Sequence, residues 1–122
     1  MQTIFAIAAG GAIGAVLRHF ISLWAALPVF GGILTVNILG SFMLGALVSW
    51  FAHVQQPPQA VTAFLTVGLL GAFTTFSTFS MEAIGWLQKG EVFKAIIYIT
   101  LSVTLALAGF WLGLEAVKKI IL

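Results

Sequence analysis

Residues 68–82 read GLLGAFTTFSTFSME, which sets glycine, threonine and serine in the middle of a long apolar stretch. Glycine disfavours a helix because it loses much backbone entropy, and β-branched threonine disfavours it because its side-chain rotamers are restricted. The alternative is that the hydroxyls bond back to the carbonyl four residues earlier, which would keep the segment helical. We predict that the helix containing this segment breaks near Gly71 to Thr75.

The composition of the whole chain is that of a membrane protein. Of its 122 residues, 61% are hydrophobic and 7% are charged, and the mean hydropathy is +1.18. An ordinary soluble domain carries about 25% charged residues, so this sequence cannot build a soluble surface. The five lysines and arginines are too sparse to form a basic stripe for nucleic acid. Cysteine is absent, which excludes disulfides, thiolate metal sites and cysteine nucleophiles.

Four apolar stretches are long enough to cross a bilayer, because a helix needs about 20 apolar residues to cross about 30 Å of hydrocarbon. These stretches are residues 3–27, 32–52, 60–87 and 95–117. Small residues one turn apart, such as Gly10 and Gly14 or Ser41 and Gly45, predict close packing between the helices. The first stretch has no basic region before it and no small-residue cleavage pattern, which disfavours a signal peptide. We predict an all-α membrane protein with one transmembrane domain of four helices over residues 1–122.

Lysine and arginine are divided almost evenly between the two sides of this predicted domain. Lys118 and Lys119 would lie on the side of the N-terminus. Lys89, Lys94 and Arg18 would lie on the other side. The positive residues of short loops set the orientation of the chain in the membrane, so a count of two positive residues against three does not select one orientation. The chain could therefore insert both ways up and form an antiparallel homodimer, and a single dominant orientation is the alternative.

Polar and aromatic side chains on three helices could line a path for an ion. Asn37 lies inside the second helix, where its amide must find either a passing ion or a partner on another helix. Tyr98 and Ser102 are hydroxyl donors one turn apart, although Tyr98 also suits the interfacial aromatic belt. Phe76 and Phe79 carry ring edges with partial positive charge that can solvate an anion, although such pairs usually pack in a core.

Few ionisable groups are expected inside the membrane. Arg18 and Glu82 are the strongest candidates, and such groups usually face the bundle interior or an aqueous vestibule. His19 and His53 have no carboxylate or cysteine partner at ligand spacing, so we do not expect either to bind a metal. The sequence has no nucleophile–base constellation, glycine-rich phosphate loop or cofactor fingerprint. We therefore predict that the protein is not an enzyme.

Over essentially its whole length the sequence resembles the CrcB/Fluc family of fluoride channels. The motifs that carry the resemblance are GGAIGAVLRHF (10–20), VNILGSFMLG (36–45) and GLLGAFTTFSTFSME (68–82), and the last is the most specific. The resemblance implies a dual-topology antiparallel homodimer with two pores in the bacterial inner membrane, and passive fluoride exit that lowers fluoride toxicity. His19 stands where the family commonly has an aromatic residue, which leaves the contacts around Arg18 open.

The resemblance also implies roles for individual residues. The residues that match the family's fluoride pore are Asn37, Phe76, Phe79, Tyr98 and Ser102, with Ser77 and Thr78 as further hydroxyls. Arg18 matches the arginine of the first helix and would lie in a vestibule. A structural sodium ion at the dimer centre would be bound by the backbone carbonyls of Gly71 and Thr74.

Two other functions compete with a channel. A small multidrug transporter also packs four helices into this length, but it needs a carboxylate in the first helix, where Arg18 is the sole charged side chain. A purely structural membrane subunit is the other alternative. In that case Phe79→Ile or Asn37→Asp would change stability, with no ion flux to lose.

Overall fold

The computed structural model describes residues 1–24 and 31–122, and in these residues all regular secondary structure is helical. In chain order the elements are α1 (Gln2–Trp24), α2 (Gly31–His53), α3 (Gln59–Thr62), η1 (Ala63–Leu70), α4 (Gly71–Phe73), α5 (Phe76–Gln88) and α6 (Val92–Ile121). The predicted end of the first helix, at residue 27, and the connection that follows it lie outside the described residues.

Four helical stretches of the described chain are long and apolar enough to cross a membrane, as predicted from the composition. They are Gln2–Trp24, Gly31–His53, Gln59–Gln88 and Val92–Ile121. The last of them extends beyond both ends of the apolar stretch 95–117. The added residues include Lys94 in its first turn and Lys118 and Lys119 in its last turn.

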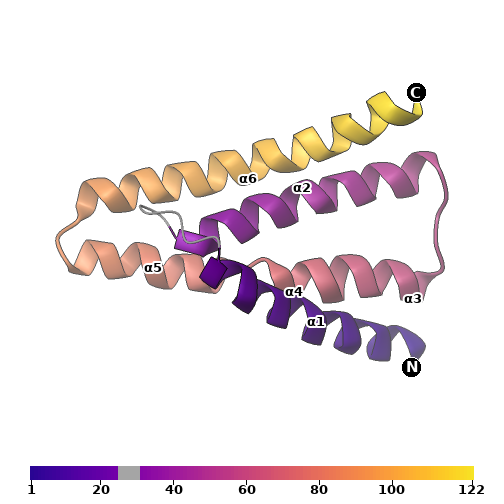
Figure 1. Ribbon diagram of the computed structural model, residues 1–122, viewed down its shortest axis with the longest axis horizontal. Helices are drawn as coiled ribbons and strands as arrows, with labels where there is room; N and C mark the ends of the chain where they lie inside the picture. The colour runs from indigo at the N-terminus through magenta and orange to yellow at the C-terminus, as the bar shows by residue number, and fades with distance from the viewer. Residues whose placement is uncertain (25–30) are drawn as a thin grey trace.

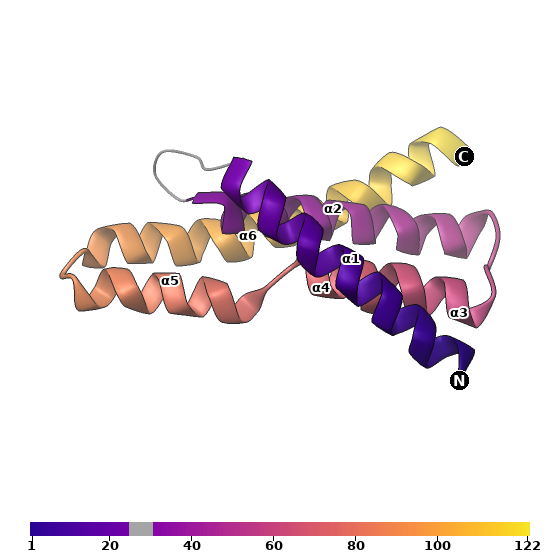
Figure 2. The same cartoon turned by 60° about the horizontal axis from the view of Figure 1, so that its bottom comes forward.

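The helices form a bundle in which α2 and α6 run side by side and α1 lies against the stretch from α3 to α4 (Figure 1). α2 packs along α6, and α5 packs against the first half of α6. α1 packs against η1 and α4 and crosses the bundle obliquely (Figure 2). The α5–α6 hairpin extends beyond α1 at the left of Figure 1, whereas both termini and the α2–α3 connection lie at the right.

Glycines allow the close contact between α2 and α6. A Cβ atom added to Gly45 would overlap the carbonyl oxygen of Phe110, and one added to Gly113 would overlap that of Phe42. Lipid supplies no hydrophobic force between helices, so this close backbone approach and its van der Waals contacts hold the pair together. Gly14 allows the same approach of α1 to η1. The prediction of close packing at the small residues is therefore confirmed at these positions.

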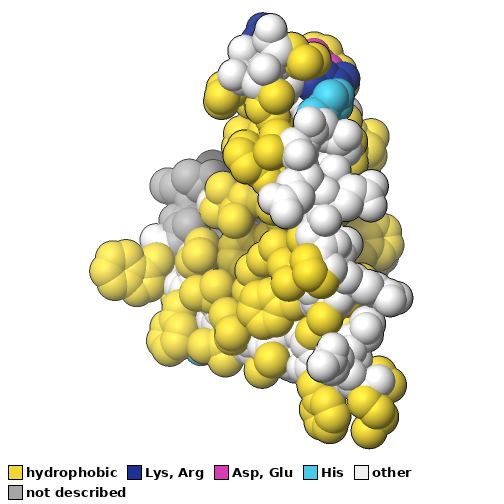
Figure 3. All heavy atoms as spheres, turned by 90° about the vertical axis from the view of Figure 1, so that its right-hand side faces the viewer, with side chains coloured by type: hydrophobic (Ala, Val, Ile, Leu, Met, Phe, Trp, Pro, Cys, Tyr) yellow, Lys and Arg dark blue, Asp and Glu magenta, His cyan; other side chains and the backbone are white. Residues whose placement is uncertain are grey.

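Large apolar side chains cover much of the outer surface. Trp24, Phe93 and Trp111 are 91%, 76% and 59% exposed. Figure 3 shows apolar side chains over most of the end that carries the termini, with charged side chains gathered at one edge. The ion pair between Lys118 and Glu115, at 2.9 Å, lies near this end of α6. A surface of this kind is stable against lipid or another apolar surface, not against water.

An extended link of two residues separates α4 from α5 (Figure 2). Thr74 has φ −87° and ψ 156°, and Thr75 has φ −151° and ψ 124°. Helix resumes at Phe76 because Thr75 is the N-cap of α5, where its Oγ1 accepts a hydrogen bond from the Thr78 N–H at 3.2 Å. The link places the first turn of α5 beside α2 and near the middle of the molecule.

Candidate functional site

Asn37 of α2 binds both backbone groups of the extended residue Thr75. Its Nδ2 donates to the Thr75 carbonyl at 2.9 Å, and its Oδ1 accepts from the Thr75 N–H at 2.7 Å. An extended residue inside an apolar bundle has no helical partner for these groups, and an unpaired group there is costly. The Asn37 amide takes the place of that partner. Of the two alternatives for this amide, a passing ion or a partner within the protein, the structure shows the partner within the protein.

The link is also held from the side of α1. Nη1 of Arg18 donates to the carbonyl oxygen of Thr74 at 3.3 Å. Since the Thr75 N–H donates to Asn37, it does not supply the hydrogen bond that a continuous helix would give to the carbonyl of Gly71. Two side chains from different helices thus set the conformation of the link, and the Gly71 carbonyl loses its usual helical donor.

A groove of about 270 Å³ runs beside the link between α2, α5 and α6. Its lining residues are Asn37, Ser41, Thr74, Thr75, Phe76, Phe79, Ser102, Val103, Ala106 and Leu107. The structure therefore brings together four of the predicted pore residues, which are Asn37, Phe76, Phe79 and Ser102. The groove combines amide and hydroxyl groups with phenyl rings, and its lining contains no charged side chain among the described residues.

Ser102 lines this groove, and its hydroxyl is buried. The residue is 7% exposed, and its Oγ has no hydrogen-bond partner within the described part of the chain. A buried hydroxyl without a partner is costly, and this one keeps its O–H free to donate. Phe79 beside it is 7% exposed, whereas Phe76 at the start of α5 is 75% exposed.

The other hydroxyls of the GLLGAFTTFSTFSME segment bond locally. The Oγ1 of Thr75 lies 3.2 Å from both the Ser77 Oγ and the Thr78 Oγ1, so these two hydroxyls belong to the N-cap of α5 and do not line the groove. Thr74 Oγ1 donates to the Leu70 carbonyl at 3.0 Å. Back-bonding to the carbonyl four residues earlier therefore occurs at Thr74, but it does not keep the segment helical, because Thr74 and Thr75 are extended.

Tyr98 lies behind the groove, with its side chain fully buried. Its hydroxyl donates to Oε2 of Glu82 at 2.5 Å, so this hydroxyl already has a strong acceptor. Full burial differs from the position of an interfacial belt residue, which presents its polar tip to water. Glu82, which the sequence places inside the third helix, is paired with this phenol across α5 and α6.

A row of aromatic rings leads from the groove toward the α5–α6 connection. The ring centroids are 5.2 Å apart for Phe76 and Phe79, 5.3 Å for Phe79 and Tyr98, and 4.7 Å for Tyr98 and Trp86. Sequence reasoning did not single out Trp86. Its spacing from Glu82 and Phe79, at four and seven residues, places all three on one face of α5 and could have revealed it.

The fold and the groove together define a class. This is a multi-pass membrane protein in which an extended link between two helical segments lies beside a groove of neutral donors and aromatic rings. A family described as "CrcB-like protein, Camphor Resistance (CrcB)" matches residues 5–114. The chain therefore belongs to the CrcB family, in agreement with the resemblance of its three motifs.

Similar proteins cover almost the whole chain. One from Rhodospirillum centenum is 38% identical over 122 residues, which cover 97% of this chain and 97% of that protein. One from Shewanella halifaxensis is 43% identical and covers 96% of this chain and 97% of its own length. One from Rhizobium meliloti is 38% identical and covers 99% of this chain and all of its own length, 100%. Each of the three is named fluoride-specific ion channel FluC.

Proposed function

We propose that this protein is a fluoride-selective channel through which fluoride leaves the cytoplasm passively, so that its toxicity falls. The observation that carries the proposal is the composition of the groove. An amide, a buried hydroxyl without a partner and two phenyl rings line it, with no charged side chain in the described lining. The names of the similar proteins support the same function.

Neutral donors suit the passage of a small, strongly hydrated anion. A selective path must replace the water around the ion with many short contacts, yet each contact must be weak enough for the ion to leave. The Ser102 hydroxyl can donate to an anion, and the edges of Phe76 and Phe79 carry partial positive charge. Asn37 has two N–H groups on Nδ2, of which one is used by the Thr75 carbonyl, so the other can face the groove.

The remaining predicted pore residues would act around this groove. Tyr98 would contribute the edge of its ring, because its hydroxyl donates to Glu82. Ser77 and Thr78 would contribute hydroxyls at the N-terminus of α5, where the helix dipole favours an anion. Arg18, which is half-buried beside the link, would provide the positive potential of a vestibule.

We also propose that the link is the functional break of the third membrane helix and that two chains pair in antiparallel orientation around it. Phe76 is 75% exposed in one chain, so a second chain would complete the surroundings of its ring. A sodium ion would lie between the chains, bound by the carbonyls of Gly71 and Thr74. Hard cations prefer oxygen ligands, and the Gly71 carbonyl lacks its usual helical donor. The Thr74 carbonyl would share its lone pairs between sodium and Arg18.

The proposed setting is the inner membrane of a bacterium, where the channel would conduct without catalysing a reaction. A multidrug transporter is disfavoured, because residues 1–30 contain no acidic side chain. Family membership also supports the channel over that alternative. A structural subunit is separated from a channel by one measurement of ion flux.

The test is fluoride efflux from proteoliposomes, followed with a fluoride electrode after a potassium ionophore is added, with chloride as the comparison anion. We expect fast efflux of fluoride but not of chloride, and its loss in Phe79→Ile. Phe93→Ile is the matched control, because Phe93 is 76% exposed and lies outside the groove. Absence of fluoride efflux from well-folded protein would refute the channel and favour the structural subunit.

A further inference from the structure

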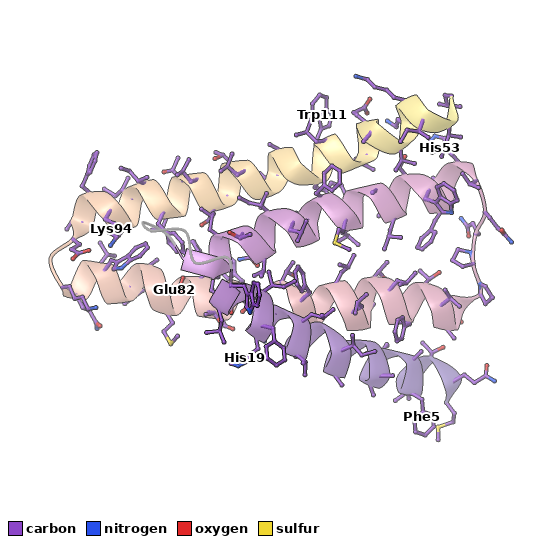
Figure 4. All side chains as sticks on the ribbon, in the orientation of Figure 1. Phe5, His19, His53, Glu82, Lys94 and Trp111 are labelled. Carbon is purple, nitrogen blue, oxygen red and sulfur yellow. The ribbon has the colours of Figure 1, made fainter. Side chains whose placement is uncertain are left out.

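Lys94 is fixed at the far end of the aromatic row. Its Nζ lies 4.7 Å from the centre of the Trp86 ring and 3.5 Å from Oε2 of Glu91. Its side chain keeps 38% of its surface exposed. In Figure 4, Lys94 lies near the α5–α6 connection, at the opposite end of the molecule from His53. A cation over an indole face is held electrostatically, so the charge stays on this ring while remaining open to solvent.

Two opposing local effects act on Lys94, because its i,i+3 ion pair with Glu91 favours the helix whereas the helix dipole does not. Lys94 lies in the first turn of α6, which begins at Val92, and the positive end of a helix dipole disfavours a cation there. Lys89, by contrast, follows the last residue of α5, where a cation is favoured. The contact with the Trp86 ring is a second interaction that holds Lys94 at this end of the row.

The row connects this charge with the groove. Two successive steps of 4.7 Å each lead from Lys94 Nζ over Trp86 to the ring of Tyr98, and Phe79 of the groove follows at 5.3 Å. The carboxyl oxygens of Glu82 beside Tyr98 carry negative partial charge and would repel an anion that approaches from this end. The positive charge of Lys94, held on Trp86 one ring beyond Tyr98, has the sign that would offset that repulsion.

We infer that Lys94 and Trp86 form an anion-collecting entrance at the α5–α6 end of the fluoride path. The inference rests on the proposed channel function and adds an entrance to it. One unit charge about 7 Å from an anion in water enriches that anion roughly two- to three-fold. Salt removes the enrichment, because the Debye length falls from about 30 Å at 0.01 M to about 3 Å at 1 M. The negative charge of Glu91, the ion-pair partner of Lys94, lowers this enrichment of the anion.

The test compares initial fluoride efflux from proteoliposomes at ionic strengths of about 0.01 M and about 1 M. We expect Lys94→Gln to lower efflux roughly two-fold at low salt and to match the unchanged protein at high salt. Lys94→Arg keeps both the charge and the ring contact, so it should retain efflux. Glu91→Gln should raise efflux at low salt, which is the opposite change. Lys119→Gln is the control, since Lys119 is an exposed lysine near the other end of α6.

Each outcome decides between the two proposals. If the unchanged protein moves no fluoride, the channel itself is refuted. If it moves fluoride but Lys94→Gln shows the same rates and salt dependence as the unchanged protein, the entrance is refuted and the channel stands. A loss of efflux that is equal at both salt concentrations would show a structural role and also refute the entrance. If Lys94→Gln does not fold, Glu91→Gln decides, because an unchanged low-salt rate in that variant refutes the entrance.

Discussion

Replacing Asn37 by leucine should destabilise the protein more than any other single change in the groove. Leucine has a similar size but offers Thr75 neither a donor nor an acceptor, so both hydrogen bonds, at 2.9 and 2.7 Å, are lost. Thr75 is 8% exposed, so little water can replace them. An unpaired buried group costs about 1–3 kcal/mol, but hydrogen bonds between membrane helices contribute only about 0.6–2 kcal/mol each. Taking both ranges, we expect a loss of about 2–4 kcal/mol.

The assay is reversible unfolding of the purified protein in detergent, with the free energy of unfolding measured for Asn37→Leu and the unchanged chain. Ser41→Ala is the matched control, because Ser41 also lines the groove from α2, one turn from Asn37. The control should unfold within about 0.5 kcal/mol of the unchanged protein. If Asn37→Leu has the same free energy of unfolding as the control, the amide does not hold the link and the reasoning is wrong. Fluoride efflux, measured on the folded fraction of the leucine variant, should fall as well.

Three further substitutions test other parts of the structure. Tyr98→Phe removes the donor to Glu82 and should lower the free energy of unfolding by about 1–3 kcal/mol. Most fluoride efflux should persist, because the ring edge remains. Loss of all efflux from folded protein would contradict the proposed role of the ring. Thr75→Val removes the N-cap of α5 and should lower the free energy of unfolding by about 1 kcal/mol, whereas Thr75→Ser should lower it less. Equal free energies of unfolding for the two variants would argue against the cap. Gly113→Leu should separate α2 from α6, seen as aggregation during size-exclusion chromatography, and a monodisperse product would contradict the close contact.

Much of the fold follows from the sequence because its causes are local. Hydropathy and length predict four membrane-crossing helices, since a helix satisfies its own backbone groups and needs only enough apolar residues to cross the bilayer. Glycine spacing predicts where backbones approach closely, as Gly14 and Gly45 do. The motifs also identified the family, because a run of polar residues at membrane depth is rare and therefore specific.

The sequence suggested which residues form the candidate site but not the contacts that they make. It assigned pore roles to Ser77 and Thr78 through the family resemblance, and the structure has both hydroxyls at the N-cap of α5. A hydroxyl can bond to several nearby groups at similar energy, so its partner depends on the local backbone path. Their part in fluoride passage stays a prediction, as do the second chain and the sodium ion.

The partners of the polar side chains were decided by the tertiary structure alone. Asn37 is 38 residues from Thr75, and Arg18 is 56 residues from Thr74. Each side chain could bond equally well to many groups at membrane depth, and only the packing of α1 and α2 against the link selects these two. The sequence by itself determined that the chain lies in a membrane as four helices and carries a polar segment in the third. Which amide holds that segment, and which rings lead to it, depends on helix packing, because hydrogen bonds and ring contacts act over a few ångströms regardless of sequence distance.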